Sequence, residues 1–524
     1  MNQPLKRPTN EGILVLDYGS QYTLLIARRL REIGIYAEVI NGSITEAPKD
    51  FLFKGVILSG GPDSVSEQGS RELHQWVLDS GVPILGICYG MQLLAEKFGG
   101  KLKSGGAREY GKATLTIQPN IDTHWAKHFE GMPHAQTVWM SHGDNVDNLT
   151  KSFELVGITE GNVVAMICHR EKPYLGLQFH PEVHHSEFGT DILRTFIEDI
   201  CKAELNWQSD DMLAATTKYV RDTVADGKVL MAVSGGVDST VAVSLMARAL
   251  GPDKVTAVFV DNGLLRKDEV SWVEKNLNSL GIHKIVTLKK ASEFYEVLKG
   301  VTDPEKKRKL IGLKFIEEFE KFADHHKEFT HLGQGTLYPD VIESAAHGSG
   351  SKVIKSHHNV GGLPEKLKLD LVEPFRFLFK DEVRRIGTSI GIPENLVQRH
   401  PFPGPGLGVR ILGEITEDKV KILQEADHIF IENLRTQNLY ATVWQAFAVL
   451  LPVKTVGVMG DNRTYQWTCA LRAVTASDGM TAGVGPLPME FLVQCSDEIV
   501  RKVDGINRVV YDITTKPPAT IEWE

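Results

Sequence analysis

Two short segments of the sequence combine reactive side chains with glycine-rich turns. The first is Ser234-Gly235-Gly236-Val237-Asp238-Ser239-Thr240, which follows the apolar run 229–233 and precedes residues that are apolar at helical spacing. A strand, a glycine turn and a helix start direct unpaired backbone N–H groups and hydroxyls at one point, where an anion binds. We therefore predict that residues 234–240 bind the phosphates of a nucleotide, with Asp238 as a ligand of Mg²⁺. The segment is not a Walker A loop, because no lysine follows the glycines.

The second segment is Gly86-Ile87-Cys88-Tyr89-Gly90, near the end of the apolar run 83–87. This is the pattern of a nucleophile elbow with cysteine as the nucleophile, and the positive end of the following helix favours the thiolate. Downstream, His180-Pro181-Glu182 follows another apolar run. In an extended chain His180 and Glu182 point to one face, so the carboxylate can orient the imidazole that accepts the thiol proton. A buried cysteine and a packed histidine would be the simpler interpretation of either residue alone.

The elements around both segments alternate between strands and helices. Apolar runs at 12–17, 55–58 and 83–87 are predicted strands, and residues 22–33 are a predicted amphipathic helix. This alternation predicts parallel sheets, whose binding sites lie beyond the carboxyl ends of the strands. Further along, residues 192–207 are predicted to be helical.

The chain of 524 residues is too long for a single core. We predict two parallel-sheet α/β domains, residues 1–207 and 208–400, and a small α+β domain, residues 401–524. The first boundary precedes a helix start at Ser209, and the second lies at the Pro/Gly-rich run 400–408. In the last domain, the predicted helices are 419–434 and 440–450, and the predicted strands are 453–459, 468–474 and 508–513.

Composition excludes several classes of protein. The net charge of −9 argues against nucleic acid as the main partner. No run reaches the roughly 20 apolar residues of a membrane span, and residues 1–10 do not form a signal peptide. Five cysteines, an odd number, do not make a disulfide framework. We therefore expect a cytoplasmic protein without a membrane partner.

The phosphate-binding segment resembles the loop of the ATP pyrophosphatases, which cleave ATP between the α and β phosphates. The elbow and His-Pro-Glu together resemble the class I glutamine amidotransferases. This resemblance implies that Cys88, His180 and Glu182 form the catalytic triad and that backbone N–H groups near Gly60 and Tyr89 form an oxyanion hole. It also implies that Gln92, His142 and Asp144 line a glutamine pocket, although His142 and Asp144 are equally typical of a solvated loop.

Together with the Pro/Gly run and the tail Lys-Pro-Pro-Ala-Thr-Ile-Glu-Trp-Glu at 516–524, the motifs resemble the family of glutamine-hydrolysing GMP synthases. The family's substrates are glutamine, ATP and xanthosine monophosphate (XMP); ATP adenylates XMP, and ammonia from glutamine then displaces AMP to give GMP. The resemblance implies Mg²⁺ with ATP, no redox cofactor, a homodimer, and XMP binding by Arg308, Lys516 and Glu522. The loop 355–362 is interpreted either as a lid over ATP or as an ordinary surface loop.

Two other functions remain open from the sequence. One is a glutamine-dependent NAD synthetase or an asparagine-synthesising enzyme, but these use a glutaminase without the cysteine elbow and His-Pro-Glu. The other is a non-enzymatic nucleotide-binding regulator with an inactive amidotransferase, against which the intact Cys88, His180 and Glu182 argue.

Overall fold

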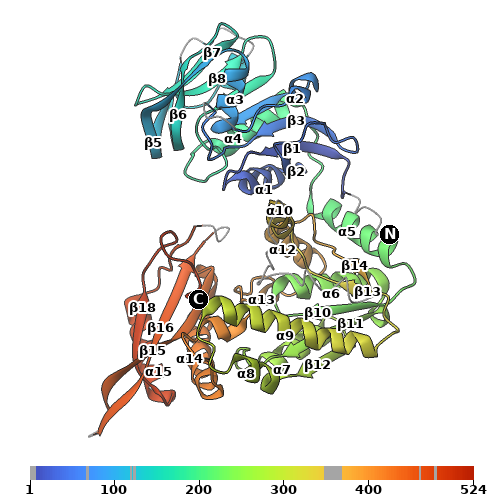
Figure 1. Cartoon of the computed structure of the whole chain (residues 1–524), viewed down its shortest axis with the longest axis vertical. Helices are drawn as coiled ribbons and strands as arrows, with labels where there is room; N and C mark the ends of the chain where they lie inside the picture. Colours follow the sequence, from blue (N-terminus) through green and yellow to red (C-terminus); the bar gives the residue numbers. More distant parts are fainter. Residues whose placement is uncertain are drawn as a thin grey trace. The chain divides into compact units, whose positions relative to one another are not determined.

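The computed structural model of the chain consists of two compact units, which are described separately (Figure 1). It describes residues 7–65, 70–118, 121, 125–346, 369–459, 462–476 and 481–524. The N-terminal unit extends to residue 215 and the C-terminal unit begins at residue 216, within helix α5 (Ser209–Val224). The domain limits predicted at 207 and 400 remain predictions, and the second of them lies inside the C-terminal unit.

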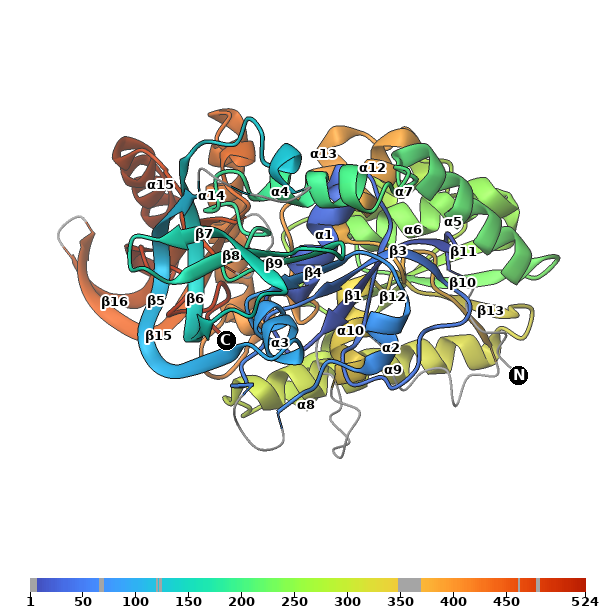
Figure 2. The same cartoon turned by 90° about the horizontal axis from the view of Figure 1, so that it is seen from above.

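The N-terminal unit is built on a nine-stranded sheet with the order β2-β1-β3-β4-β9-β8-β7-β5-β6. The five strands from β2 to β9 are parallel, and the other four pair in antiparallel fashion. Strands β4 and β9 are buried along their whole length, as expected when helices cover both faces of a parallel sheet. The long strand β5 curves strongly (Figure 2). The strands are β1 Glu11–Asp17, β2 Ala37–Asn41, β3 Leu52–Leu58, β4 Ile84–Ile87, β5 Lys101–Ile117, β6 Ala135–Asn148, β7 Phe153–Thr159, β8 Val164–His169 and β9 Tyr174–Leu177.

The helices of this unit are α1 Thr23–Ile33, α2 Gln75–Asp79, α3 Tyr89–Lys97 and α4 Gly189–Thr195, with a 3₁₀ turn at Ala126–His128 and a π-helical turn at Phe196–Ile200. The predicted helix 192–207 is wrong in its second half, because the helical conformation ends at Ile200. Beyond it, Trp207 is buried and its backbone N–H donates to the Gly34 carbonyl at 2.8 Å, so tertiary packing holds this segment without regular secondary structure. None of the described helices in the whole chain has both the length and the apolar composition of a membrane span.

The C-terminal unit begins with a five-stranded parallel sheet of order β12-β11-β10-β13-β14. Its strands are β10 Val229–Val233, β11 Val255–Asp261, β12 Ile285–Lys289, β13 His331–Gly333 and β14 Asp370–Val372. Its helices are α6 Val237–Leu250, α7 Glu269–Ser279, α8 Ala291–Leu298, α9 Pro304–His325, α10 Tyr338–Ala346, α12 Lys380–Ser389 and α13 Glu394–Val397, with a 3₁₀ turn at Pro252–Lys254. The predicted α/β class is confirmed for both parallel sheets.

Helix α9 carries a buried carboxylate that three lysines surround. The Glu318 side chain is 2% exposed, and its oxygens lie 3.0 Å from the ammonium groups of Lys290, Lys314 and Lys321. Burial by itself would raise the pKa of Glu318, but the three hydrogen bonds outweigh it and lower that pKa to about 2. The cluster therefore stabilises the folded state as long as the carboxylate is ionised.

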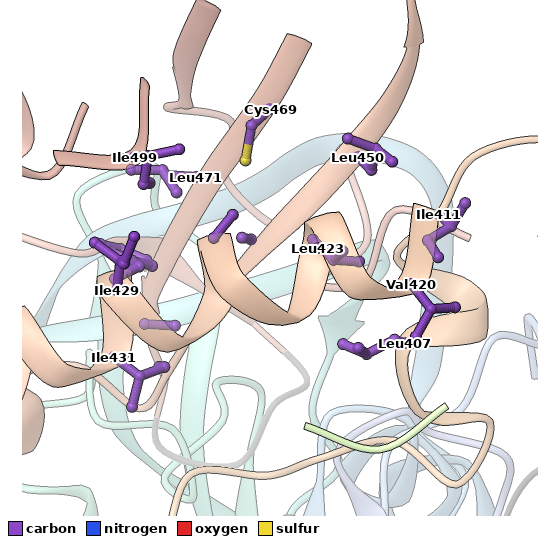
Figure 3. Packing of buried hydrophobic residues seen from close by; sticks show 14 of the residues in the cluster. Leu407, Ile411, Val420, Leu423, Ile429, Ile431, Leu450, Cys469, Leu471 and Ile499 are labelled. Atoms are coloured by element: carbon purple, nitrogen blue, oxygen red, sulfur yellow. The ribbon is translucent and has the colours of Figure 1, made fainter. Parts of the chain in front are cut away.

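The last part of the C-terminal unit is a four-stranded sheet on which α14 packs (Figure 1). Strands β15 and β16 form a long hairpin, and β17 and β18 both pair with β16. Apolar side chains from α14, β15, β16 and α15 fill the space between the layers (Figure 3). The elements are α14 Glu417–Thr436, β15 Gln445–Met459, β16 Asn462–Thr475, β17 Gly483–Val484, α15 Met489–Lys502 and β18 Ile506–Asp512, with 3₁₀ turns at Gly406–Val409 and Tyr440–Thr442.

The helix predicted at 440–450 is wrong, because most of this segment is the start of β15. Residues 446–450 are all buried, with α14 packed on one face and the C-terminal tail residue Ile521 packed against Phe447 and Val449 on the other. A strand that is buried on both faces loses the alternation of polar and apolar residues, so periodicity does not separate it from a buried helix.

Candidate active sites

Cys88 lies at a strained turn between β4 and α3. Its backbone has φ +52° and ψ −107°, a conformation that residues other than glycine rarely adopt, and Cys88 is 5% exposed. The flanking glycines are needed for close packing: a Cβ on Gly86 would lie 2.5 Å from the Gly90 carbonyl oxygen, and one on Gly90 would lie 2.3 Å from the Leu58 oxygen. The local sequence therefore folds as the predicted nucleophile elbow.

His180 and Glu182 lie beside this elbow, just beyond β9. Nδ1 of His180 is 2.7 Å from Oε1 of Glu182, and both side chains are buried. Burial alone would lower the pKa of His180, but the Glu182 charge and the neighbouring Cys88 thiol raise it well above its ordinary value. The ring edge also packs on Tyr22, with centroids 4.9 Å apart. This geometry suits a base that accepts the Cys88 proton and becomes an imidazolium.

Both predicted oxyanion-hole residues lie next to a member of the predicted triad, Gly60 beside His180 and Tyr89 directly after Cys88. A Cβ on Gly60 would be 3.2 Å from Cε1 of His180, so this glycine lies directly against the imidazole. Tyr89 is the first residue of α3, where a backbone N–H has no acceptor within the helix. The Tyr89 hydroxyl donates to the Arg71 carbonyl at 2.6 Å, which anchors the end of this side chain.

The three residues predicted to line the glutamine pocket are brought together by β6. The backbone carbonyl of Asp144 accepts hydrogen bonds from Nε2 of Gln92 at 2.9 Å and from Nδ1 of His142 at 3.0 Å. His142 is 4% exposed, and burial lowers its pKa, so its neutral form is favoured. The Cys88 thiol lies 3.7 Å from the Ser141 carbonyl on the same strand. The alternative of a solvated loop does not describe His142.

The segment 234–240, predicted to bind phosphates, connects β10 with α6 as expected. The Ser239 hydroxyl accepts from the Ser234 N–H at 3.2 Å and donates to the Gly236 carbonyl at 3.1 Å, which closes the loop on itself. Gly235 has φ +74°, and a Cβ there would lie 2.6 Å from Val273, so glycine is required. The first N–H groups of α6, those of Val237 and its neighbours, are left for an anion.

Asp238 is held next to a lysine but keeps one oxygen without a partner. Its Oδ2 is 3.2 Å from Nζ of Lys380, while its buried Oδ1 finds no hydrogen-bond donor among the described residues. In the described part of the chain, no group of three or more His, Cys, Asp or Glu side chains is arranged to hold a metal. The donor set fits a Mg²⁺ ion that takes one carboxylate from the protein and its other ligands from phosphates and water.

The residues predicted to bind XMP converge only in part. Arg308 donates to the Glu524 carbonyl, so it is bound to the tail. Glu522, a tail residue, accepts from Arg410 at 2.9 Å and from Gln445 at 2.8 Å. The backbone of Lys516 pairs with Ala482 at the other end of the tail. The predicted lid, 355–362, lies outside the described residues.

Several charged residues at these sites were not predicted from the sequence. Buried Arg399 contacts Gly235 of the phosphate loop, and buried Arg410 and Arg472 hold the tail. Lys307, also fully buried, donates to the Ile411 carbonyl at 2.7 Å and pairs with the Glu524 carboxylate. Their neighbours in sequence carry no signal for burial, although Arg399 directly precedes the Pro/Gly-rich run 400–408.

The chain matches the sequence patterns of three families in succession. The family described as glutamine amidotransferase class-I matches residues 14–200, NAD synthase matches residues 209–309, and GMP synthase C terminal domain matches residues 432–523. The NAD synthase match covers the phosphate-binding segment, whereas the C-terminal match includes most of the tail. This order agrees with the order of the motifs.

Curated relatives match over nearly the whole chain. The GMP synthase [glutamine-hydrolyzing] of Aquifex aeolicus (strain VF5) is 52% identical, with 98% of this chain and 99% of the relative covered. The proteins of the same name from Mesoplasma florum and Campylobacter fetus subsp. fetus are 50% and 51% identical, each with 98% of this chain and 100% of the relative covered. This chain therefore belongs to the family of glutamine-hydrolysing GMP synthases.

Proposed function

We propose that this chain makes GMP from XMP, ATP and glutamine, using the residues assigned above at two active sites. The observation that carries the proposal is the buried Cys88, His180 and Glu182 arrangement in the same chain as a glycine loop at the end of β10. Either site alone would fit other enzymes. Together, the first site supplies ammonia, and the second converts an oxygen of XMP into a leaving group that ammonia displaces.

At the first site, Cys88 acts as the nucleophile. His180 accepts the thiol proton, and the sulfur attacks the side-chain carboxamide carbon of glutamine. We assign the backbone N–H groups at Gly60 and Tyr89 to the oxyanion hole that stabilises the charge developing on the carboxamide oxygen. His180 returns the proton to the leaving nitrogen, ammonia departs, and water hydrolyses the thioester to glutamate. Gln92, His142 and Asp144 are assigned to the glutamine pocket.

At the second site, the O2 oxygen of XMP attacks the α phosphorus of ATP. Residues 234–240 bind the departing pyrophosphate, and the bond between the α and β phosphates breaks. Ammonia then attacks C2 of the adenylated purine, and AMP leaves with the oxygen. Arg308, Lys516 and Glu522 are assigned to XMP binding; the support is that Glu522 and Lys516 belong to the tail 516–524 and that Arg308 donates to Glu524 of the same tail.

We also propose that ATP binds with Mg²⁺ and that Asp238 is its protein ligand. The support is the unpartnered, buried Oδ1 atom beside the phosphate loop. The ion would offset negative charge on the leaving pyrophosphate. The role of the protein is to hold one carboxylate oxygen in place, and Lys380 fixes the other.

Two further proposals concern the state of the protein. A homodimer through the last sheet is supported by exposed apolar side chains on it, among them Val456, Val458 and Tyr465, which are 59%, 73% and 67% exposed. Light scattering would show about twice 58.1 kDa for a dimer, and a single species of 58.1 kDa would contradict the dimer.

A cytoplasmic location is supported by five cysteines of which none forms a disulfide.

The experiment that tests the proposed function follows XMP amination with two nitrogen donors. The wild-type chain should convert ATP to AMP and pyrophosphate and form GMP with either glutamine or ammonium salts. Cys88→Ala should lose the reaction with glutamine only, and Asp238→Asn should lose it with both donors. Cys168→Ala, a buried cysteine of the same unit outside the elbow, is the control for Cys88→Ala. Release of ADP and phosphate instead of AMP and pyrophosphate would refute the proposal.

A further inference from the structure

Arg399 lies buried under the phosphate loop and contacts its backbone. Nη1 donates to the Gly235 carbonyl at 2.7 Å, and Nη2 lies 2.7 Å from both carboxylate oxygens of Glu269 on α7. The guanidinium also stacks on Trp272, with its carbon 4.1 Å from the ring centroid. The side chains of Arg399 and Glu269 are 6% and 5% exposed. Three segments distant in sequence therefore meet at one guanidinium.

These contacts do not suit an arginine that binds phosphate itself. The carboxylate of Glu269 neutralises the guanidinium charge, and the hydrogen bonds to Gly235 and Glu269 use both terminal nitrogens of Arg399. One face of its plane is covered by Trp272. An arginine that grips a phosphate presents its planar fork of donors to that anion, whereas here the fork faces a protein carboxylate and a protein carbonyl.

The geometry of the peptide bond links Arg399 to the donors of the loop. In a planar trans peptide, the C=O of one residue and the N–H of the next point in opposite directions. Since the Gly235 carbonyl points at Arg399, the Gly236 N–H points away from it, toward the Ser234 hydroxyl at 3.4 Å. With glycine on both sides of this bond, rotation of the peptide plane meets little steric resistance. A rotated plane would present a carbonyl oxygen to the phosphates in place of an N–H.

The segment that carries Arg399 is itself firmly held. The His400 ring stacks on Tyr440 with centroids 3.7 Å apart, and the His400 N–H donates to the Tyr440 hydroxyl at 2.9 Å. The Pro401 carbonyl accepts from Gln445 at 3.1 Å. These contacts fix the backbone on the C-terminal side of Arg399, so its side chain approaches Gly235 from a fixed point.

We propose that Arg399 is a positioning residue of the synthetase site, which holds the Gly235–Gly236 peptide so that the Gly236 N–H faces the pyrophosphate of ATP. Glu269 neutralises and orients the guanidinium. The proposal rests on the proposed function of residues 234–240 as the pyrophosphate-binding loop. It adds that the loop is ordered before ATP arrives, by a residue that touches no substrate.

The test compares Arg399→Lys and Glu269→Gln with Arg266→Lys as a matched control. Arg266 is another buried arginine of this unit; its Nε lies 3.1 Å from the Asp427 carboxylate and its guanidinium stacks on Phe402. Among the described residues it makes no hydrogen bond to residues 234–240. The measurements are kcat/KM for ATP, KM for XMP, and the product-inhibition constant of pyrophosphate, all with ammonium salts as the nitrogen donor. Thermal unfolding of each variant reports whether it is folded.

Arg399→Lys should lower kcat/KM for ATP and raise the pyrophosphate inhibition constant by about 10- to 100-fold, the effect of losing one hydrogen bond to a charged group. Lysine keeps the charge but not the fork that reaches Gly235 and Glu269 together. The KM for XMP should stay unchanged, as should all three constants in Arg266→Lys.

Glu269→Gln separates positioning from direct binding by the sign of its effect, and it keeps the test informative if Arg399→Lys does not fold. If Arg399 bound phosphate directly, removal of its counter-charge would tighten pyrophosphate binding, whereas loss of positioning weakens it. Tighter binding in Glu269→Gln, or unchanged constants in Arg399→Lys, would overturn the inference. Failure of the wild-type chain to form AMP and pyrophosphate would instead refute the proposed function of the loop.

Discussion

Replacing Glu182 by glutamine should disable the glutaminase while leaving the synthetase intact. The carboxylate is fully buried, and its Oε1 lies 2.7 Å from Nδ1 of His180. Its other oxygen, Oε2, has no hydrogen-bond partner among the described residues, so the carboxylate of Glu182 interacts mainly with His180. Glutamine has nearly the same shape, and the change therefore removes the charge without leaving a cavity.

The size of the effect follows from this distance. Two unit charges 2.7 Å apart attract by about 6 kcal/mol at an effective dielectric constant of about 20, which is an upper limit because both charges are delocalised. Loss of the analogous carboxylate in a serine protease triad lowers kcat by about 10⁴. We expect glutamine hydrolysis by Glu182→Gln to fall by about 10²- to 10⁴-fold.

The pH profile gives a second, independent readout. The Glu182 charge raises the pKa of His180, so its removal should lower that pKa. If the active form pairs a thiolate with an imidazolium, the alkaline limb of kcat/KM for glutamine should move to lower pH. The assay is ammonia release from glutamine across pH, with ammonium-dependent GMP formation as the control for folding. Activity within about tenfold of wild type and an unmoved alkaline limb would refute the assigned role of Glu182.

Three further predictions test local features of the fold. Gly90→Ala should abolish glutamine hydrolysis and lower the melting temperature, because its Cβ would lie 2.3 Å from the Leu58 oxygen; a variant with normal ammonia release would contradict the tight packing of the elbow. Glu318→Gln should lower the free energy of unfolding at pH 7 by about 3 kcal/mol, because the folded-state pKa of about 2 lies below the ordinary 4.5. This contribution is fully present above pH 4.5 and is lost as the pH falls toward 2, so denaturant unfolding at both ends of that range should show the difference vanish in acid. Glu524→Ala should destabilise the C-terminal unit by about 3–5 kcal/mol, because it leaves the fully buried Lys307 without its carboxylate, and a change below about 1 kcal/mol in chemical unfolding would refute the pairing.

The parts of the fold and sites that the sequence predicts are those written in consecutive residues. The elbow at 86–90 and the loop at 234–240 each combine a buried strand, a glycine turn and a helix start within a few positions. His180 and Glu182 are two residues apart, so the extended chain alone brings them to one face. In these cases local geometry fixes the arrangement: the predicted contact between His180 and Glu182 is present, and residues 234–240 connect a strand with a helix start as predicted.

The contacts that the sequence does not predict join residues that are far apart. Arg399 and Glu269 are 130 positions apart, and Arg410 and Glu522 are 112 apart. Charged side chains are mostly exposed, so composition and periodicity assign each of them to the surface. Only the tertiary structure reveals that each buried charge has its partner.

The C-terminal tail shows why such buried pairs matter for function as well as for stability. A buried cation is strongly destabilising unless it is paired, so Arg410 requires the carboxylate that Glu522 provides. Gln445 donates to Oε1 of Glu522 at 2.8 Å, and Nε of Arg410 donates to Oε2 at 3.1 Å. Both carboxylate oxygens of Glu522 are therefore oriented by the protein. If Glu522 contacts the purine or ribose of XMP as proposed, it does so from a position fixed when the protein folds. Binding then incurs little further loss of conformational freedom, which favours affinity and a defined orientation of the purine.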